Sequence, residues 1–255
     1  MLPRIILLLL AIGFAPAGHA EKITIAAASD LKGCLDEVAA NFRKAHVGDE
    51  VEVVYGSSGK FKTQIEQGAP FDLFFSADDA FPRELLKANL AVGEVHPYAI
   101  GRLALWSKTI DAGNLKISDL TRADIRKIAI ANPQHAPYGK RAEEALRASG
   151  VWEKVEGKLV YGENISQTAQ FAESGNAQVG IIALSLVLGP ELAGEGSYSI
   201  VPDSLHQPLA QGFVITARAA DNALAKAFAD YMGSGQTRSV MVRYGFALAG
   251  EASGH

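Results

Sequence analysis

The stretch "VVYGSSGKFKTQIEQGAPFDLFFSADD", residues 53–79, holds one strand–helix–strand unit with a serine pair at its first turn. The apolar run 51–55 predicts a strand, and the apolar spacing that follows predicts a helix from Phe61 to Gly68. A second strand is predicted over 71–77. This alternation is typical of a parallel sheet covered by helices, with loops at the carboxyl ends of the strands.

The same alternation continues on both sides of this unit. "KITIAAA" (22–28) predicts a strand that stops at Ser29, and a helix face then runs from Leu31 to Phe42. The segment 98–108 is interpreted as a strand that enters a second lobe. Beyond it we expect strands at 127–131, 179–182 and 212–218, helices between them, and closing helices around 228–232 and 239–244.

These patterns predict two α/β lobes with a ligand cleft between them. Residues 21–101 together with 204–255 are assigned to the first lobe, and residues 102–203 to the second. The two chain crossings would then form a hinge. Clefts at the carboxyl ends of parallel strands are common positions for small-ligand sites.

The amino terminus has the features of a secretory signal. Residues 1–4 carry one arginine, residues 5–14 are almost wholly apolar, and small residues lead to Ala20. We expect residues 1–20 to be a signal peptide cleaved after Ala20, because the apolar run is about half the ~20 residues that a membrane span needs. The mature chain is therefore expected in the periplasm of a bacterium.

Composition narrows the function classes. The chain has 255 residues, a formal net charge of -4 and a pI near 5.9, so no basic footprint for nucleic acid is present. The single cysteine, Cys34, cannot form an internal disulfide and lies on the apolar face of a predicted helix, which indicates a core position. Nothing in the sequence demands more than a monomer.

The serine pair of "GSSGK" (56–60) fits several kinds of site. A phosphate-binding P-loop is excluded, because Val54 stands where that motif needs glycine and Phe61 where it needs serine or threonine. A serine hydrolase is an open alternative, although 56–59 is one residue short of the nucleophile elbow. No His-x-x-x-His motif or cysteine pair suggests a metal ligand set.

The remaining interpretations are a helix cap and an anion site. Ser57 or Ser58 is well placed to cap the following helix. Helix amino termini also present unpaired N–H groups and a partial positive charge, which bind oxyanions. Ser29, Tyr138 and Ile165 lie at comparable strand-to-helix junctions, so four such starts, two from each lobe, could face one cleft.

The sequence resembles the periplasmic molybdate-binding proteins of ABC transporters. The resemblance is carried by "ITIAAASDLKGCLDEVAANF", "YGSSGKFKTQIEQGAPFDLFFSADD", "ANPQHAPYGKRAEEAL" and "KAFADYMGSGQTRSVMVRYGFAL", which extend along almost the whole mature chain. It implies a type II periplasmic-binding-protein fold with no chemical step and no cofactor. It also implies delivery of molybdate or tungstate to a membrane permease.

The resemblance also implies the ligand set. Ser29 and Ser58 would each donate a hydroxyl and an amide, and Tyr138 and Ile165 would donate backbone amides from the second lobe. No side chain would bind the metal directly, because the ligand is held as an oxyanion. Uncharged donors suit a fully deprotonated anion, since none of them needs to accept a proton from it.

Two positions depart from the family pattern. Many members supply a tyrosine hydroxyl where this chain has Ala183, so either Tyr138 contributes its own hydroxyl or the site has one hydrogen bond fewer. Asp30, directly after Ser29, would repel a dianion. We expect its carboxylate to point away into capping or lobe packing, with Arg102 at the lobe crossing available to offset it.

Three more basic residues lie near the predicted mouth of the cleft. Lys60, Lys140 and Arg141 add positive charge there, and Lys140 and Arg141 are interpreted as solvated surface. Alternatives to molybdate stay open. A sulfate or phosphate binder is the nearest, with Asp30 as the acceptor for a protonated phosphate. A secreted hydrolase, or a sensory or adhesive domain without a permease partner, represents other classes.

Overall fold

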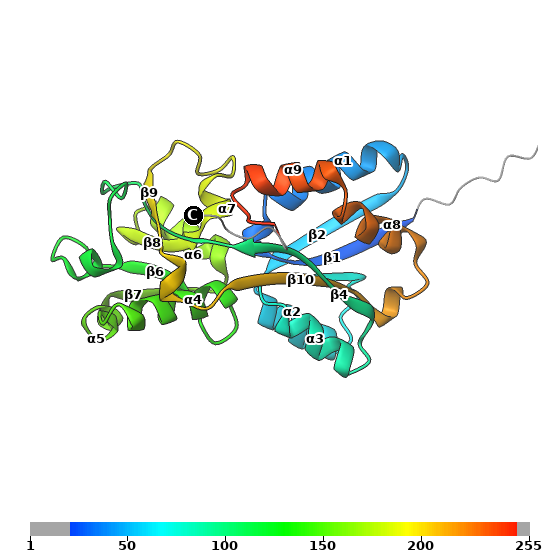
Figure 1. The fold of residues 1–255 in the computed structure, drawn as a ribbon, viewed down its shortest axis with the longest axis horizontal. Coiled ribbons are helices and arrows are strands. Elements are labelled where there is room, and N and C mark those ends of the chain that lie inside the picture. The colour runs from blue at the N-terminus through cyan, green and yellow to red at the C-terminus, as the bar shows by residue number, and fades with distance from the viewer. Residues whose placement is uncertain (1–20, 249–255) are drawn as a thin grey trace, which may run out of the picture.

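The computed structural model describes residues 21–248, which fold into two α/β lobes (Figure 1). Each lobe is built on a five-stranded sheet, ordered β2-β1-β3-β10-β4 in the first lobe and β7-β6-β8-β5-β9 in the second. The predicted signal peptide, residues 1–20, lies outside the described residues. No helix among residues 21–248 is long and apolar enough to cross a membrane.

The first lobe contains both ends of the described chain, in blue and orange-red in Figure 1. Its elements are β1 (Lys22–Ala28), the 3-10 turn Ser29–Leu31, α1 (Cys34–Ala45), β2 (Glu50–Gly56), α2 (Ser58–Glu66), β3 (Leu73–Ser76), α3 (Ala80–Lys87), β4 (Ala91–Gly101), β10 (Leu209–Thr216), α8 (Ala223–Met232) and α9 (Gly235–Arg243).

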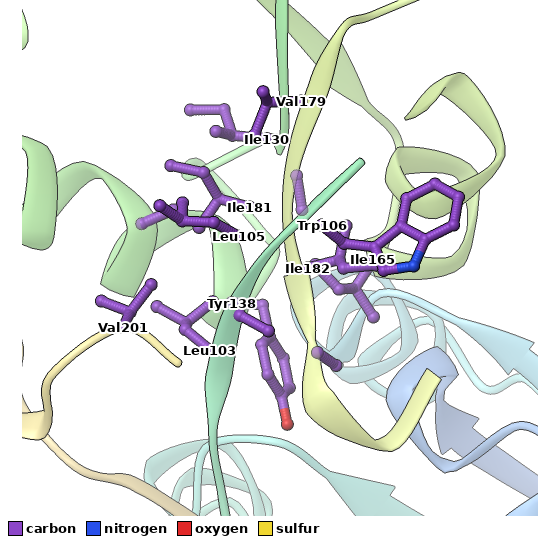
Figure 2. Close-up of a cluster of buried hydrophobic side chains, with 14 of the residues drawn as sticks. Leu103, Leu105, Trp106, Ile130, Tyr138, Ile165, Val179, Ile181, Ile182 and Val201 are labelled. Carbon is purple, nitrogen blue, oxygen red and sulfur yellow. The ribbon is translucent and has the colours of Figure 1, made fainter. Parts of the chain in front are cut away.

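The second lobe is the green and yellow part of Figure 1. Its elements are β5 (Leu103–Ser107), β6 (Ile128–Ala131), α4 (Pro137–Ala148), α5 (Trp152–Val155), β7 (Leu159–Gly162), α6 (Ile165–Glu173), β8 (Val179–Ala183), α7 (Leu184–Val187) and β9 (Ser197–Ile200). Its core contains the side chains of Leu105, Ile130 and Ile181 (Figure 2).

Helices cover both faces of the first sheet, which explains why its central strands β1 and β3 are mostly apolar. Ile23 and Ile25 of β1 belong to the cluster under α1, α8 and α9, and Ala26 belongs to the cluster on the opposite face under α2 and α3. Strands buried on both sides read as continuous apolar runs. Cys34 is buried in the first of these clusters, so its predicted core position is confirmed.

The prediction of parallel sheets holds for only part of each sheet. The pairs β1–β2, β1–β3, β6–β7 and β6–β8 are parallel. However, β10 runs antiparallel to β3 and β4, and β5 runs antiparallel to β8 and β9. Both sheets are therefore mixed, because β10 in the first sheet and β5 in the second run against the direction of the other strands.

The crossings lie side by side. The predicted single strand at 98–108 is wrong: β4 ends at Gly101 in the first sheet, and β5 begins at Leu103 in the second. The chain returns between Ile200 and Leu209, and Leu209 pairs with Gly101. Two adjacent segments of chain, at Arg102 and between Ile200 and Leu209, thus connect the lobes, which is the geometry of a hinge.

Candidate functional site

A small cavity lies between the lobes at the ends of β1 and β2. It encloses about 190 Å³ including space open to solvent, below the 300–1,000 Å³ typical of drug-sized ligands. It is lined by residues from both lobes: Ala28, Ser29, Asp30, Gly56, Ser57, Ser58, Ala77, Ala136, Pro137, Tyr138 and Ile165. All four predicted site residues are therefore brought together at one cavity suited to a small ligand.

Ser58 lies in the first turn of α2 and is fully buried. Its Oγ accepts a hydrogen bond from the Ala77 amide at 3.0 Å, which leaves the hydroxyl proton available to a ligand. The predicted cap by the serine side chains is wrong. Ser57 is the N-cap residue, but its hydroxyl donates across the lobes to the His135 carbonyl at 2.9 Å instead.

Ser29 follows β1 and occupies a 3-10 turn rather than the first turn of the predicted helix. That helix, α1, begins only at Cys34, because Gly33 with φ of 78° turns the chain between them. The Ser29 hydroxyl donates to Asn164 Oδ1 at 3.1 Å and accepts from the Ser166 amide at 3.2 Å. Both partners belong to the second lobe, so Ser29 joins the lobes at the cavity wall.

Two helices of the second lobe begin at the cavity. Pro137 stands at the start of α4, where its missing N–H costs nothing, and Tyr138 follows it. Asn164 caps α6 by accepting from the Gln167 amide at 3.0 Å, and Ile165 is the first helical residue. The predicted helix starts at these two positions are confirmed.

The first amide group of each of these helices that carries an N–H has no partner among the described residues. The first N–H groups of a helix have no partner inside it. Within residues 21–248, no acceptor is found for the amides of Ser58, Tyr138 or Ile165. Three helix amino termini, those of α2, α4 and α6, thus direct unpaired N–H groups and partial positive charge to one cavity, an arrangement that binds anions.

Asp30 lies on the same cavity wall with no exposed surface. Its Oδ2 accepts from Gln211 Nε2 at 2.8 Å and from the Tyr138 hydroxyl at 3.1 Å. Figure 2 shows this hydroxyl directed away from the apolar cluster of the second lobe. Burial raises the pKa of Asp30 to about 7, against the lowering effect of the Gln211 and Tyr138 hydrogen bonds. The carboxylate therefore joins the two lobes, as the lobe-packing expectation has it, but Asp30 also lines the cavity.

The structure also bears on whether the Tyr138 hydroxyl replaces the tyrosine donor that many family members have where this chain has Ala183. The Tyr138 hydroxyl is taken up by Asp30 and Gln211, so it does not replace a tyrosine donor at Ala183. Ala183 ends β8 and is not part of the cavity wall. The Asp30 carboxylate accepts from the side chains of Tyr138 and Gln211, and no interaction with Arg102, which was available to offset its charge, is found among the described residues.

Further contacts hold the lobes together around the cavity. The amide of Gly59 donates to the His135 carbonyl at 2.9 Å, and Lys60 forms an ion pair with Glu163. Burial lowers the pKa of the His135 imidazole, and the nearby Lys60 lowers it further while Glu163 opposes the change. The lobes are therefore closed on each other in this structure.

The interpretation of Arg141 as solvated surface is wrong. Its side chain is buried, donates to Glu144 at 2.8 Å and lies 3.5 Å from Asp78 of the first lobe. A position one turn into α4 faces the cleft rather than solvent, because the helix starts at the cavity. Lys140, one residue earlier, is exposed as expected.

Sequence reasoning missed Gln211, which holds Asp30 from β10. A signal was present: Gln211 is the polar residue in the apolar run "PLAQGFVIT", and it is buried. The strand was predicted to begin at Gly212, so this residue fell outside it. His135 and Ser166 also make contacts across the cleft, but no pattern in the sequence around them indicates this.

The chain matches known proteins over nearly its whole length. A family model described as bacterial extracellular solute-binding protein matches residues 23–247. The molybdate-binding protein ModA of Rhodobacter capsulatus is 37% identical over 243 residues, covering 94% of this chain and 93% of that protein. The ModA protein of Azotobacter vinelandii is 35% identical over 248 residues, covering 97% and 98%.

Solved structures agree with this assignment. The periplasmic molybdate-binding protein of Azotobacter vinelandii superposes with a TM-score of 0.83 at 31% identity, covering 89% of this chain and 99% of that chain. The architecture is thus that of two-lobed solute-binding proteins. By its sequence over residues 23–247 and by its fold, the chain belongs to the family of bacterial extracellular solute-binding proteins.

Proposed function

We propose that this protein captures molybdate or tungstate in the interlobe cavity and delivers it to the permease of an ABC transporter. The observation that carries the proposal is the convergence of three unpaired helix amides and one free hydroxyl proton on a buried cavity. Such donors stabilise a fully deprotonated oxyanion without a basic side chain. The relatives named as molybdate-binding proteins support this choice of ligand.

The structure represents the closed state of the transport cycle in this proposal. Ser29 and Ser58 belong to the first lobe and Tyr138 and Ile165 to the second, so all four reach one ligand only when the lobes close. Opening at the two crossings would separate the two pairs of donors. Ligand affinity is thereby coupled to a change of shape that a membrane permease can recognise.

Selection among tetrahedral anions follows from the spacing of the hydrogen-bond donors relative to the size of the anion. Donors that are fixed by β1, α2, α4 and α6 cannot all contact an anion smaller than the one for which they are spaced. We expect sulfate, with its shorter bonds, to bind more weakly than molybdate and tungstate. Phosphate carries a proton near neutral pH and would need an acceptor, for which Asp30 is the candidate at the cavity wall.

Calorimetric titration of residues 21–255 with molybdate, tungstate, sulfate and phosphate tests the ligand. We expect saturable binding of one molybdate or tungstate per chain and much weaker binding of sulfate and phosphate. Ser58→Ala should weaken molybdate binding by about five- to 150-fold, because one donor lost from a buried anion costs about 1–3 kcal/mol. The exposed Ser204→Ala provides a matched control.

The competing hydrolase has one supporting contact. Ser57 Oγ lies 2.9 Å from His135 Nδ1, and His135 Nε2 lies 3.8 Å from Glu163. The same hydroxyl donates to the His135 carbonyl, and the contact joins opposite lobes, so it occupies the space that a substrate would need. We therefore expect no turnover of a nitrophenyl ester. Turnover abolished by replacing Ser57 or Ser58 would instead establish an enzyme.

The proposal also covers the processing of the chain, its location in the cell and its oligomeric state. We propose that residues 1–20 are cleaved after Ala20 and that the mature chain works as a monomer in the periplasm without binding nucleic acid. Mass spectrometry of periplasmic extract should give a chain that begins at Glu21. Light scattering of the mature chain purified from this extract should give the mass of one chain, with and without molybdate.

A further inference from the structure

The Asp30 carboxylate has an unusual environment for a group beside an anion cavity. It has no exposed surface, the side-chain hydrogen bonds that it receives come from the neutral groups of Gln211 and Tyr138, and its own backbone amide adds a weaker contact. Within the described residues its other oxygen, Oδ1, has no hydrogen-bond partner. A buried, ionised carboxylate with a partnerless oxygen is costly, and a dianion at the same cavity would raise that cost.

Among residues 21–248, no positively charged side chain is found to offset the charge of Asp30. The titratable groups that face it are Cys34 of α1, Tyr98 of β4 and Tyr138 of α4, and burial raises the pKa of all three, so they stay neutral near pH 7. The other described residues that contact it or share its cavity wall include, from the neighbouring elements, these uncharged ones: Gly56 from β2, Ile165 from α6, Ser185 from α7 and Gln211 from β10.

We infer that Asp30 is a proton-linked specificity residue: the protein binds a dianion with Asp30 protonated, and it takes up that proton from solvent when the anion binds. This inference rests on the proposed oxyanion site. Protonation turns the partnerless carboxylate oxygen into a hydroxyl that can donate, while Oδ2 keeps its bonds to Gln211 and Tyr138. Asp30 then offers the cavity a donor in place of a negative charge, which suits a fully deprotonated anion and disfavours one that must donate a proton.

The sign of the pH dependence follows from linkage. In the anion-free cavity burial raises the pKa of Asp30 from 3.8 to about 7, and a dianion bound beside it would raise the pKa further. Binding therefore takes up a proton at pH values between the lower and the higher pKa. The affinity for molybdate should fall as pH rises through and above 7, by at most about tenfold per pH unit.

Calorimetry in paired buffers measures this proton directly. Molybdate is titrated into residues 21–255 at roughly pH 6, 7 and 8.5, each in two buffers that differ in their heat of ionisation. The difference in observed heat gives the number of protons exchanged. We expect uptake that approaches one proton per molybdate near pH 8, together with weaker binding than at pH 6.

Asp30→Asn is the matched variant. It keeps an acceptor oxygen for Gln211 and Tyr138 and places an N–H donor where the protonated carboxyl would have its hydroxyl. We expect no proton uptake, an affinity independent of pH, and tighter binding than the parent at pH 8.5. Asp124→Asn, which removes an exposed carboxylate that pairs with Arg122 away from the cavity, should behave as the parent does.

The outcomes separate this inference from the proposed function. Molybdate binding without proton uptake in the parent, or uptake that persists in Asp30→Asn, overturns the role of Asp30 but leaves the oxyanion site intact. Preferred binding of phosphate without proton uptake also overturns it, because Asp30 would then be an acceptor. Failure to bind any of the four anions overturns the proposed function itself. The parent's own proton count decides the inference if the variant does not fold.

Discussion

At the residue scale, Asp30 affects folding as well as binding. Its pKa of about 7 in the folded chain lies above the ordinary value of 3.8, so the unfolded chain ionises first as pH rises. The folded state therefore loses stability between about pH 4 and pH 7, and the loss is complete above pH 7. This cost sits at the ligand cavity, where a neutral residue would fold more easily.

We predict that Asp30→Asn raises the melting temperature of the anion-free protein at pH 8 and changes it little at pH 4. The reason is that the variant removes the buried charge that exists only at the higher pH. Thermal unfolding followed by circular dichroism at both pH values checks this. An equal shift at both would show that the change in stability does not come from ionisation.

Gly59 gives a second prediction at this scale. A Cβ at this position would lie 2.7 Å from the His135 carbonyl oxygen, which belongs to the opposite lobe. Gly59→Ala should thus oppose closure while favouring α2, since alanine is the better helix former by about 1 kcal/mol. We expect weaker molybdate binding with an unchanged or higher melting temperature without ligand. A variant that binds as tightly as the parent would contradict the closed contact.

The residues that sequence reasoning found are those with a local signal. Ser58, Tyr138 and Ile165 lie at helix starts, and a helix start can be recognised from its own neighbours. Gln211 and His135 act through contacts with residues more than 70 positions away. Such contacts depend on how the lobes meet, which the periodicity of a single strand or helix does not encode.

At the scale of elements, α4 fits closely against the end of β6. A Cβ on Gly139 would lie 2.0 Å from the Ala131 carbonyl oxygen, and this neighbour is backbone that cannot swing aside. The close approach fixes where the amide of Tyr138 lies. Similar precision at α2 and α6 is what allows three helices to aim at one small cavity.

We predict that Gly139→Ala lowers the free energy of unfolding by about 1–3 kcal/mol, as overpacking does in other cores. The variant should also weaken molybdate binding, because α4 must shift and carry the Tyr138 amide with it. Denaturant unfolding and calorimetry measure the two effects. Gly157→Ala, where a Cβ would meet no atom within 4 Å, is the control and should leave both values unchanged.

Elements were predicted well where a strand is apolar throughout and a helix follows. The strand at 22–28 agrees with β1 in both bounds. The edge strand β4 was largely missed because its segment 92–97 mixes polar and apolar residues without a clear period. The antiparallel entry of β5 and β10 also had no signal, since strand direction is set by the partner strands.

At the scale of the whole molecule, the lobes meet through hydrogen bonds and a few ion pairs. Lys60 and Glu163 form one of these pairs at the mouth of the cleft, with both side chains about half exposed. An exposed pair of this kind contributes about 0–1 kcal/mol and is screened by salt. The pair therefore adjusts the lifetime of the closed state and does not determine whether it forms.

We predict that Glu163→Gln accelerates molybdate dissociation by less than about fivefold at low salt and has no measurable effect near 1 M salt. Stopped-flow displacement of molybdate by excess tungstate measures the rate. Glu153→Gln, an exposed residue of α5, is the control. A large effect that persists at high salt would mean that Glu163 contacts the ligand site by another route.

The position of β10 has a consequence for the order in which the chain folds. In the first sheet β10 separates β3 from β4, so β4 has no strand neighbour until residues 209–216 have been made. The second sheet is complete by Ile200. A chain that emerges amino terminus first can thus finish the inserted lobe while the lobe that began earlier still waits for its last strand. The half of the molecule that is started first is finished last.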